Sequence, residues 1–365
     1  MDQLYRSIIS GERAGALPAI LRFVFEIASW VYALIVNVRN LLFDLGVRKV
    51  HKLPVPVISV GNITTGGTGK TPTVIMLIRE LQRLGKNPAV LTRGYASPRL
   101  ADGTLGKADE VLVIEHECPG VPVVVNPDRV AGGRTAIDKY HADVLVLDDG
   151  FQHRRLHRDL NILLCDATEP LGIPGLLPRG TWREPPHNMN RANMIMLTRC
   201  EQVAPELADL AAGLLTQWVT PRAIFQQRTT VSGLHDARGD AVPLVAGGRK
   251  VFGFAGIGNP NGFLHTLRSL GMQVSAALWL DDHHHYRLPR DLLPLTRAAA
   301  TRHPDALVTT LKDWVKVRNL PLPPAPPVWH VRIEARLRPH EQELLRTRLA
   351  LLTNAVAPEP LPTNS

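Results

Sequence analysis

A glycine-rich stretch with an embedded lysine, Gly61–Thr71, holds the residue types in this chain that are best suited to binding phosphate. It follows an apolar run, Val55–Val60, and precedes a segment with helical spacing, Thr73–Leu84. Strand, glycine-rich loop, Gly-Lys-Thr and helix is the order of a P-loop, in which glycines let backbone N–H groups approach phosphate oxygens. We therefore predict that nucleotide phosphates bind to Thr64, Gly66, Gly67, Thr68, Gly69, Lys70 and Thr71.

Two side chains of this loop have separate expected roles. Lys70 is expected to reach the β- and γ-phosphates and to act in catalysis, and Thr71 to offer its hydroxyl to Mg²⁺. The usual pattern places glycine six residues before the lysine, where this chain has Thr64. A plain glycine turn followed by a chance Lys-Thr is the alternative, and the flanking strand and helix patterns favour the P-loop.

An acidic pair follows a second apolar run. Val144–Leu147 ends in Asp148 and Asp149. The carboxyl ends of parallel strands meet at one sheet edge, and Mg²⁺ prefers carboxylate, water and phosphate oxygens. We therefore predict a magnesium site that uses Thr71, Asp148 and Asp149; an acidic turn at a strand end is the alternative.

Polar residues near these strand ends are candidates for substrate binding. Gln152 and His153 follow the acidic pair, and Arg183 belongs to a basic group that could neutralise an anionic substrate. Arg93 and Tyr95 follow a further strand candidate, Pro88–Leu91, where a strand-end turn explains the spacing equally well.

A dense acid–imidazole patch, Asp281–Tyr286, lies far along the chain. Three adjacent histidines project in different directions, so a three-histidine metal site is not expected. An Asp–His pair that acts in proton transfer fits better, and a polar loop before a helix is the alternative.

Composition limits the class of protein. The chain has 365 residues, a net charge of +9 and 45% apolar residues, so a large core is possible and the basic excess suits nucleic acid, anionic lipid or a phosphorylated substrate. Its three cysteines, Cys118, Cys165 and Cys200, show no CxxC spacing, which argues against a disulfide framework or zinc site and fits a reducing cytoplasm.

Residues 17–45 have helical apolar spacing with a separate polar stripe. Their longest charge-free stretch, Ile27–Val38, is shorter than the roughly 20 residues needed to cross a bilayer. We therefore predict an amphipathic helix that lies in or on a membrane surface, with a helix packed on the domain as the alternative.

Short apolar runs alternate with helical segments over the rest of the chain. This predicts an α/β fold: a P-loop NTPase-like parallel sheet covered by helices on both faces, a smaller C-terminal α/β unit and the N-terminal amphipathic helix. The expected strands are 55–60, 88–91, 111–114, 121–125, 144–147, 162–165 and 194–198, then 250–255, 273–280 and 306–310, and residues 166–190 are expected to form a long functional loop. The expected domains are residues 1–50, 51–230, 231–350 and a tail, 351–365.

Together these motifs resemble the tetraacyldisaccharide 4′-kinase (lipid A 4′-kinase) family. The resemblance runs from the N-terminal helix to about Lys316, and the P-loop of that family also lacks the first glycine. It is carried by Gly61-Asn62 and Thr64–Pro72, Arg93-Gly94-Tyr95, Asp148–Arg154, Leu176-Leu177-Pro178 with Gly180, Arg183-Glu184-Pro185, Phe254–Gly258, Asp282-His283-His284 with Tyr286, and Lys312-Asp313.

The resemblance implies an ATP- and Mg²⁺-dependent kinase that transfers the γ-phosphoryl to the 4′-hydroxyl of a tetraacylated glucosamine disaccharide 1-phosphate. It implies that His283 works with an acidic residue, for which Asp109 is the matching position. The usual glycine and proline around that acid are absent here, and Leu311 stands where the family has glutamate. It also implies a peripheral enzyme on the cytoplasmic face of the bacterial inner membrane, with a lipid disaccharide monophosphate as substrate, no nucleic acid and no obligatory protein partner.

Three other functions are alternatives. A partitioning-type switch ATPase would carry lysine where this chain has Thr65. A GTPase would carry Asn-Lys-x-Asp, which does not occur in the sequence. A catalytically weakened nucleotide-binding membrane protein is the third, motivated by the altered residues around Asp109.

Overall fold

The computed structural model describes residues 3–94, 107–220, 223–244, 248–258, 260–281, 284, 286, 292–322 and 325–355. The chain forms two compact units: the first comprises residues 1–93, 118–229 and 335–365, and the second comprises residues 94–117 and 230–334. The domains expected from the sequence were consecutive stretches, whereas these units interleave along the chain.

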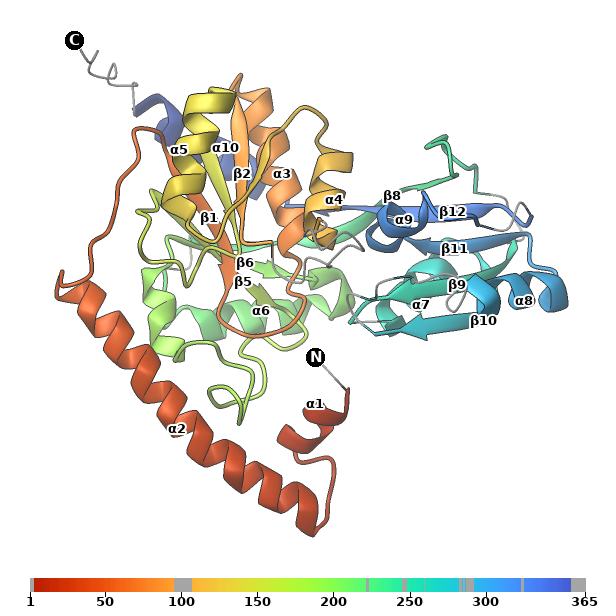
Figure 1. The fold of residues 1–365 in the computed structure, drawn as a ribbon, viewed down its shortest axis with the longest axis horizontal. Helices are drawn as coiled ribbons and strands as arrows, with labels where there is room; N and C mark the ends of the chain where they lie inside the picture. Colours follow the sequence, from red (N-terminus) through yellow and green to blue (C-terminus); the bar gives the residue numbers. More distant parts are fainter. Residues whose placement is uncertain are drawn as a thin grey trace, which may run out of the picture. The chain divides into compact units, whose positions relative to one another are not determined.

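A parallel sheet forms the centre of the first unit (Figure 1). It has seven strands, in the order β3-β2-β4-β1-β5-β6-β7. Every neighbouring pair in it is parallel. Its strands β1, β4 and β6 are buried along their whole length, as expected for a sheet covered on both faces. The bounds are β1 (Val57–Asn62), β2 (Pro88–Thr92), β3 (Val123–Val125), β4 (Val144–Asp148), β5 (Leu160–Asp166), β6 (Met194–Thr198) and β7 (Ile224–Gln226).

The helices of this unit cover the sheet. Helices α5 (Arg129–Tyr140) and α6 (Pro205–Leu215) pack on apolar clusters that include Leu145 and Ile195. The connections that contain α5 and α6 run along the sheet toward β7, whereas helix α3 (Lys70–Arg83) connects β1 to β2 and runs toward β3. Right-handed crossovers therefore put α3 on the face opposite to α5 and α6. Short 3₁₀ helices lie at Pro186–Arg191 and Cys200–Gln202. The predicted fold class is confirmed.

The last helix, α10 (Pro339–Ala355), returns to the first unit and was not predicted. It is joined to α3 through the buried carboxylate of Glu80, which accepts hydrogen bonds from Gln342 and Arg346. Nothing in the local sequence indicates this pairing, because Glu80 and its two partners lie more than 260 residues apart in the chain.

At the N-terminus, α1 (Gln3–Ile9) precedes the long helix α2 (Ala16–Asp44), drawn in red in Figure 1. Most large apolar side chains of α2 are exposed, for example Phe23 and Leu34, while the polar Ser29 and Asn40 are buried together with Val36 and Phe43. By length and composition α2 could cross a membrane, with a mean hydropathy of 1.9 over its most apolar window, so the limit inferred from Ile27–Val38 was too strict. A helix in a protein core has the reverse arrangement, with its apolar side chains buried and its polar side chains exposed.

The second unit contains a five-stranded sheet in the order β10-β9-β11-β12-β8. One predicted strand, 111–114, is instead part of helix α4, because Val111 and Ile114 are spaced to bury one helical face and acidic residues begin the first turn. The bounds are α4 (Asp109–Glu117), β8 (Arg228–His235), β9 (Lys250–Gly256), α7 (Pro260–Ser269), β10 (Gln273–Leu280), α8 (Leu292–Arg302), β11 (Ala306–Thr310), α9 (Leu311–Val317) and β12 (Val328–Arg336).

Candidate active site

The predicted P-loop connects β1 to α3. Gly66 and Gly69 have φ angles of 109° and 81°, in the region that favours glycine, and Gly69 directly precedes Lys70, the first residue of α3. The side chain of Asn62 donates to the carbonyl of Thr64 at 2.5 Å and accepts from Lys70 Nζ at 3.3 Å. The end of β1 therefore shapes the loop and orients its lysine.

Residues at the end of β6, which is separated from β1 by β5, also bind the loop. The Thr198 hydroxyl donates to the carbonyl of Thr68 at 3.0 Å, and Arg199 donates to the carbonyl of Gly67 and forms an ion pair with Asp166. Sequence reasoning missed Thr198 and Arg199, although their place at a strand end, like that of Asp148, was a usable signal. These groups bind loop carbonyls, and the Thr65 N–H donates to the carbonyl of Thr181. The N–H groups of the following glycines and of Lys70 remain the predicted donors to an anion.

The acidic pair lies at the end of β4, beside the loop. Asp148 is the last residue of the strand, and Asp149 follows with a φ of 54°. Arg183 Nη1 lies 2.9 Å from both carboxylate oxygens of Asp149, and Lys70 Nζ lies 3.9 Å from one of them. Burial raises the pKa of Asp149, but the charges of Lys70 and Arg183 outweigh it and lower the pKa below its ordinary value.

Close packing around two glycines holds this edge in place. A Cβ at Gly150 would lie 2.6 Å from Ser59 Oγ and 2.7 Å from Leu147 Cβ. A Cβ at Gly61 would lie 2.7 Å from Phe151 Cβ. The turn after Asp149 therefore fits against β1 only with glycine at both positions.

The predicted substrate residues are distributed around the same edge. Gln152 donates to the carbonyl of Asn62 at 2.9 Å. Burial, together with Arg129, Arg158 and Arg155, lowers the pKa of His153 to about 4, so its imidazole is neutral near pH 7. Arg93 follows β2 and is exposed, and Tyr95 lies outside the described residues.

Arg129 is a further residue that sequence reasoning missed. It begins α5, is buried, and donates to the carbonyl of Asn126 at 2.9 Å. Burial lowers its pKa while Asp148 and Asp149 oppose this shift, so its charge acts directly on the acidic pair. A single buried arginine in a helix leaves no pattern in the sequence, which is why it was not found.

A second group of charges forms within the second unit. Asp109 at the start of α4 is 3% exposed, and its carboxylate lies 3.1 Å from Lys316 Nζ and 4.0 Å from Lys312 Nζ. Lys316 also lies 3.1 Å from Asp313, which accepts a hydrogen bond from Tyr286 at 3.0 Å.

This acid–lysine cluster (Asp109, Tyr286, Lys312, Asp313 and Lys316) joins motifs that are far apart in the chain. The carbonyl of His284 accepts from Lys316 at 3.0 Å, and a Cβ at Gly256 would lie 2.9 Å from His284 Cβ. The structure therefore brings Asp109, Gly256, His284 and Tyr286 together, whereas Asp282 and His283 lie outside the described residues.

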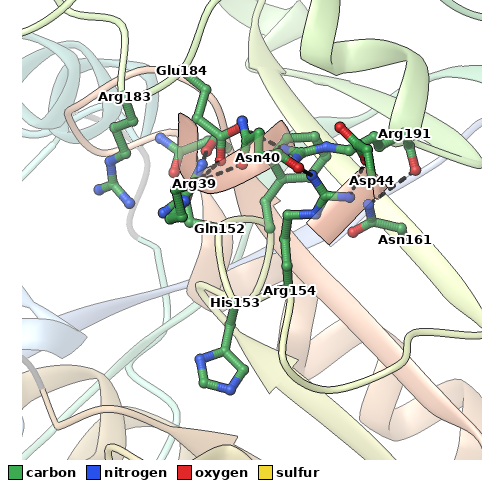
Figure 2. A network of polar contacts seen from close by, with 12 residues as sticks. Arg39, Asn40, Asp44, Gln152, His153, Arg154, Asn161, Arg183, Glu184 and Arg191 are labelled. Carbon is green, nitrogen blue, oxygen red and sulfur yellow. Dashed lines mark hydrogen bonds and ion pairs between the residues drawn. The ribbon is translucent and has the colours of Figure 1, made fainter. Parts of the chain in front are cut away.

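The loop after β5 also contacts α2, as Figure 2 shows. The carboxylate of Glu184 is fully buried and accepts from Arg39 at 3.0 Å, Asn40 at 2.9 Å and Arg191 at 2.7 Å. Next to it, Arg154 lies 2.5 Å from Asp44 near the end of α2. Polar residues of α2 thus bind to the loop that carries Arg183.

A parallel sheet, a glycine-rich loop between β1 and α3, and an acidic pair at the end of β4 define a P-loop nucleotide-binding protein. Residues 21–350 match the family model of tetraacyldisaccharide-1-P 4′-kinase. The tetraacyldisaccharide 4′-kinases of Syntrophus aciditrophicus and Geobacter sulfurreducens are 40% and 39% identical to this chain, over 91% and 86% of it and over 93% and 89% of their own lengths.

A solved structure of the same family also matches this chain. LpxK from Aquifex aeolicus, crystallised in complex with ATP, superposes with a TM-score of 0.69 at 30% identity and covers 92% of this chain and 99% of its own. The chain belongs to the tetraacyldisaccharide 4′-kinase family and is a kinase of lipid A biosynthesis. The family resemblance stated from the sequence is confirmed.

Proposed function

We propose that the protein transfers the γ-phosphoryl of ATP to the 4′-hydroxyl of a tetraacylated glucosamine disaccharide 1-phosphate. The assignment rests on the position of Lys70 and Arg183, which both contact Asp149 beside the glycine-rich loop. Carbonyls of this loop are bound by Thr198 and Arg199. Lys70 and the backbone of Thr64–Thr71 bind the phosphates, which places the charge of the transferred group against fixed donors.

The donor set fits Mg²⁺, because the Thr71 hydroxyl and the carboxylates of Asp148 and Asp149 are hard oxygen ligands. Within the described residues no cluster of three or more His, Cys, Asp or Glu is arranged for a metal ion, so phosphate oxygens and water would complete the shell. When bound, the ion would neutralise charge on the β- and γ-phosphates. Arg183 already contacts both oxygens of Asp149 and holds this carboxylate in a fixed orientation.

Asp109 is the base in this proposal: its carboxylate accepts the proton of the sugar hydroxyl as the phosphoryl group is transferred. Lys316 and Lys312 hold it in place. His283 remains a predicted partner for Asp109. Arg93, Tyr95, Gln152, His153 and Arg183 remain the predicted residues for the anionic substrate.

We also propose that α2 attaches the enzyme to the cytoplasmic face of the inner membrane, because its exposed side is apolar and its buried side is polar. The Leu34→Glu variant should then reduce flotation with phosphatidylglycerol vesicles several-fold. Leu351→Glu, at an equally exposed leucine of α10, is the control and should float like the wild type. Equal flotation of both variants would contradict the attachment through α2.

The test of the activity is an assay of purified protein with γ-labelled ATP, Mg²⁺ and a lipid disaccharide monophosphate. We expect a labelled bis-phosphorylated lipid, and no product when EDTA removes Mg²⁺. Release of labelled phosphate without a lipid product would contradict the proposal and favour a switch ATPase.

A further inference from the structure

One short segment of the first unit, residues 181–184, contacts both α2 and the phosphate-binding edge. We call it the strap. It belongs to the long loop between β5 and β6, and its side chains Arg183 and Glu184 are labelled in Figure 2.

On one side the strap binds α2. The Glu184 carboxylate is 0% exposed and accepts from Arg39 and Asn40, which are consecutive on α2. About two turns earlier in α2, the Tyr32 hydroxyl donates to the carbonyl of Arg183 at 2.9 Å. These contacts come from the polar side of a helix on which most large apolar side chains are exposed.

On the other side the strap binds the P-loop region. The Arg183 N–H donates to the carbonyl of Ile63 at 2.7 Å, and the Thr65 N–H donates to the carbonyl of Thr181 at 2.7 Å. The guanidinium of Arg183 then reaches both oxygens of Asp149.

The contacts place Glu184 against α2 and Arg183 against Asp149. Because the two residues are consecutive in the chain, whatever fixes the backbone of Glu184 also constrains that of Arg183. The buried carboxylate requires partners, because its charge is balanced by two cations, Arg39 and Arg191, and Asn40 adds a third donor.

We propose that Glu184 is a positioning residue: by docking the strap on α2, it sets Arg183 against Asp149 and so ties the apolar helix to the phosphate-binding edge. The inference rests on the proposed function. Its consequence is that the helix contributes to turnover as well as to attachment, since displacement of a catalytic group by about 1 Å can cost roughly 100-fold in rate.

The experiment compares Glu184→Gln with Glu80→Gln in full-length protein. Glu80 is the matched control, because it is also a buried, ion-paired carboxylate of the first unit but contacts α3 and α10 instead. We expect Glu184→Gln to lower kcat for the lipid substrate by about 10- to 100-fold. Glu80→Gln should lower the melting temperature at least as much as Glu184→Gln does, and it should leave kcat within about twofold of the wild type.

The combination with Arg183→Ala separates positioning from general damage. If Glu184 acts through Arg183, the double variant should be no slower than Arg183→Ala alone, whereas Glu80→Gln should keep its small effect in either background. Tyr32→Phe removes only one hydroxyl and should lower kcat about three- to tenfold, which keeps the test valid if Glu184→Gln folds poorly.

Three outcomes would decide against the inference. Equal kcat for Glu184→Gln and Glu80→Gln would overturn it, and so would an undiminished effect of Glu184→Gln in the Arg183→Ala background, or wild-type kcat in Tyr32→Phe. A wild-type enzyme that forms no phosphorylated lipid would instead overturn the proposed function, and this result is visible before any variant is measured.

Discussion

The P-loop edge of the first unit and the acid–lysine cluster of the second unit hold charge in different ways. The P-loop edge uses backbone: glycines at positive φ, carbonyls bound by Thr198 and Arg199, and few side chains. The cluster uses side chains, with Asp109 held by Lys312 and Lys316. A backbone site is encoded by one contiguous motif, while a side-chain site is assembled from several distant segments.

Removal of the main cation of the P-loop edge should have the largest effect. Lys70→Ala is expected to lower kcat/KM for ATP by about 10³-fold or more, because the phosphates lose the cation that the loop itself supplies. Circular dichroism and melting should stay near wild type. Lys52→Ala, at an exposed lysine, should retain full activity. Wild-type turnover in Lys70→Ala would remove the P-loop from the mechanism.

The second unit is tested by Asp109→Asn, which should lower kcat by about 10²- to 10³-fold and change KM for ATP by less than about threefold. Glu117→Gln is a matched control on the same helix, because Glu117 is also buried and ion-paired, with Arg332 at 2.7 Å. It should lose stability but keep kcat. Similar rates in the two variants would mean that Asp109 only stabilises the unit.

The packing of the acidic turn gives an intermediate effect. Gly150→Ala should destabilise the protein by about 1–3 kcal/mol and reduce turnover, because the new Cβ collides with Ser59 and Leu147. Gly213→Ala lies in α6, where a Cβ meets no atom within 4 Å, and should be neutral or stabilise by up to about 1 kcal/mol. Denaturant titration measures the free energy of unfolding of both variants. Equal stability of Gly150→Ala and Gly213→Ala would contradict the close fit at Gly150.

The smallest effect is expected next to the acid–lysine cluster. His330 stacks on Trp314 of α9 with ring centroids 5.2 Å apart, and burial together with His235 and His116 lowers its pKa from 6.5 to about 3. As the pH falls from 6.5 towards 3, unfolded chains gain a proton at His330 that folded chains do not, so stability decreases.

His330→Phe keeps the stacking and removes this titration. It should flatten the loss of stability between pH 6.5 and 4 by up to about 1 kcal/mol per pH unit. Denaturant melts at several pH values measure the slope. An unchanged slope would show that His330 does not contribute to the acid response.

The sequence alone determined the P-loop, the strand that carries Asp148 and Asp149, and the fold class, because each depends on a local pattern of glycines or apolar residues. Local pattern also misled at Val111–Ile114, where a short apolar run forms part of a helix. Short apolar runs fit either element, and only packing decides between them.

Tertiary structure alone decided the rest. It turned the polar side of α2 inward so that Glu184 binds Arg39 and Asn40, buried Arg129 beside the acidic pair, and brought Lys316 to Asp109 across 207 residues of chain. Such pairs depend on long-range topology and on the need of each buried charge for a partner, and no short window of sequence carries that information.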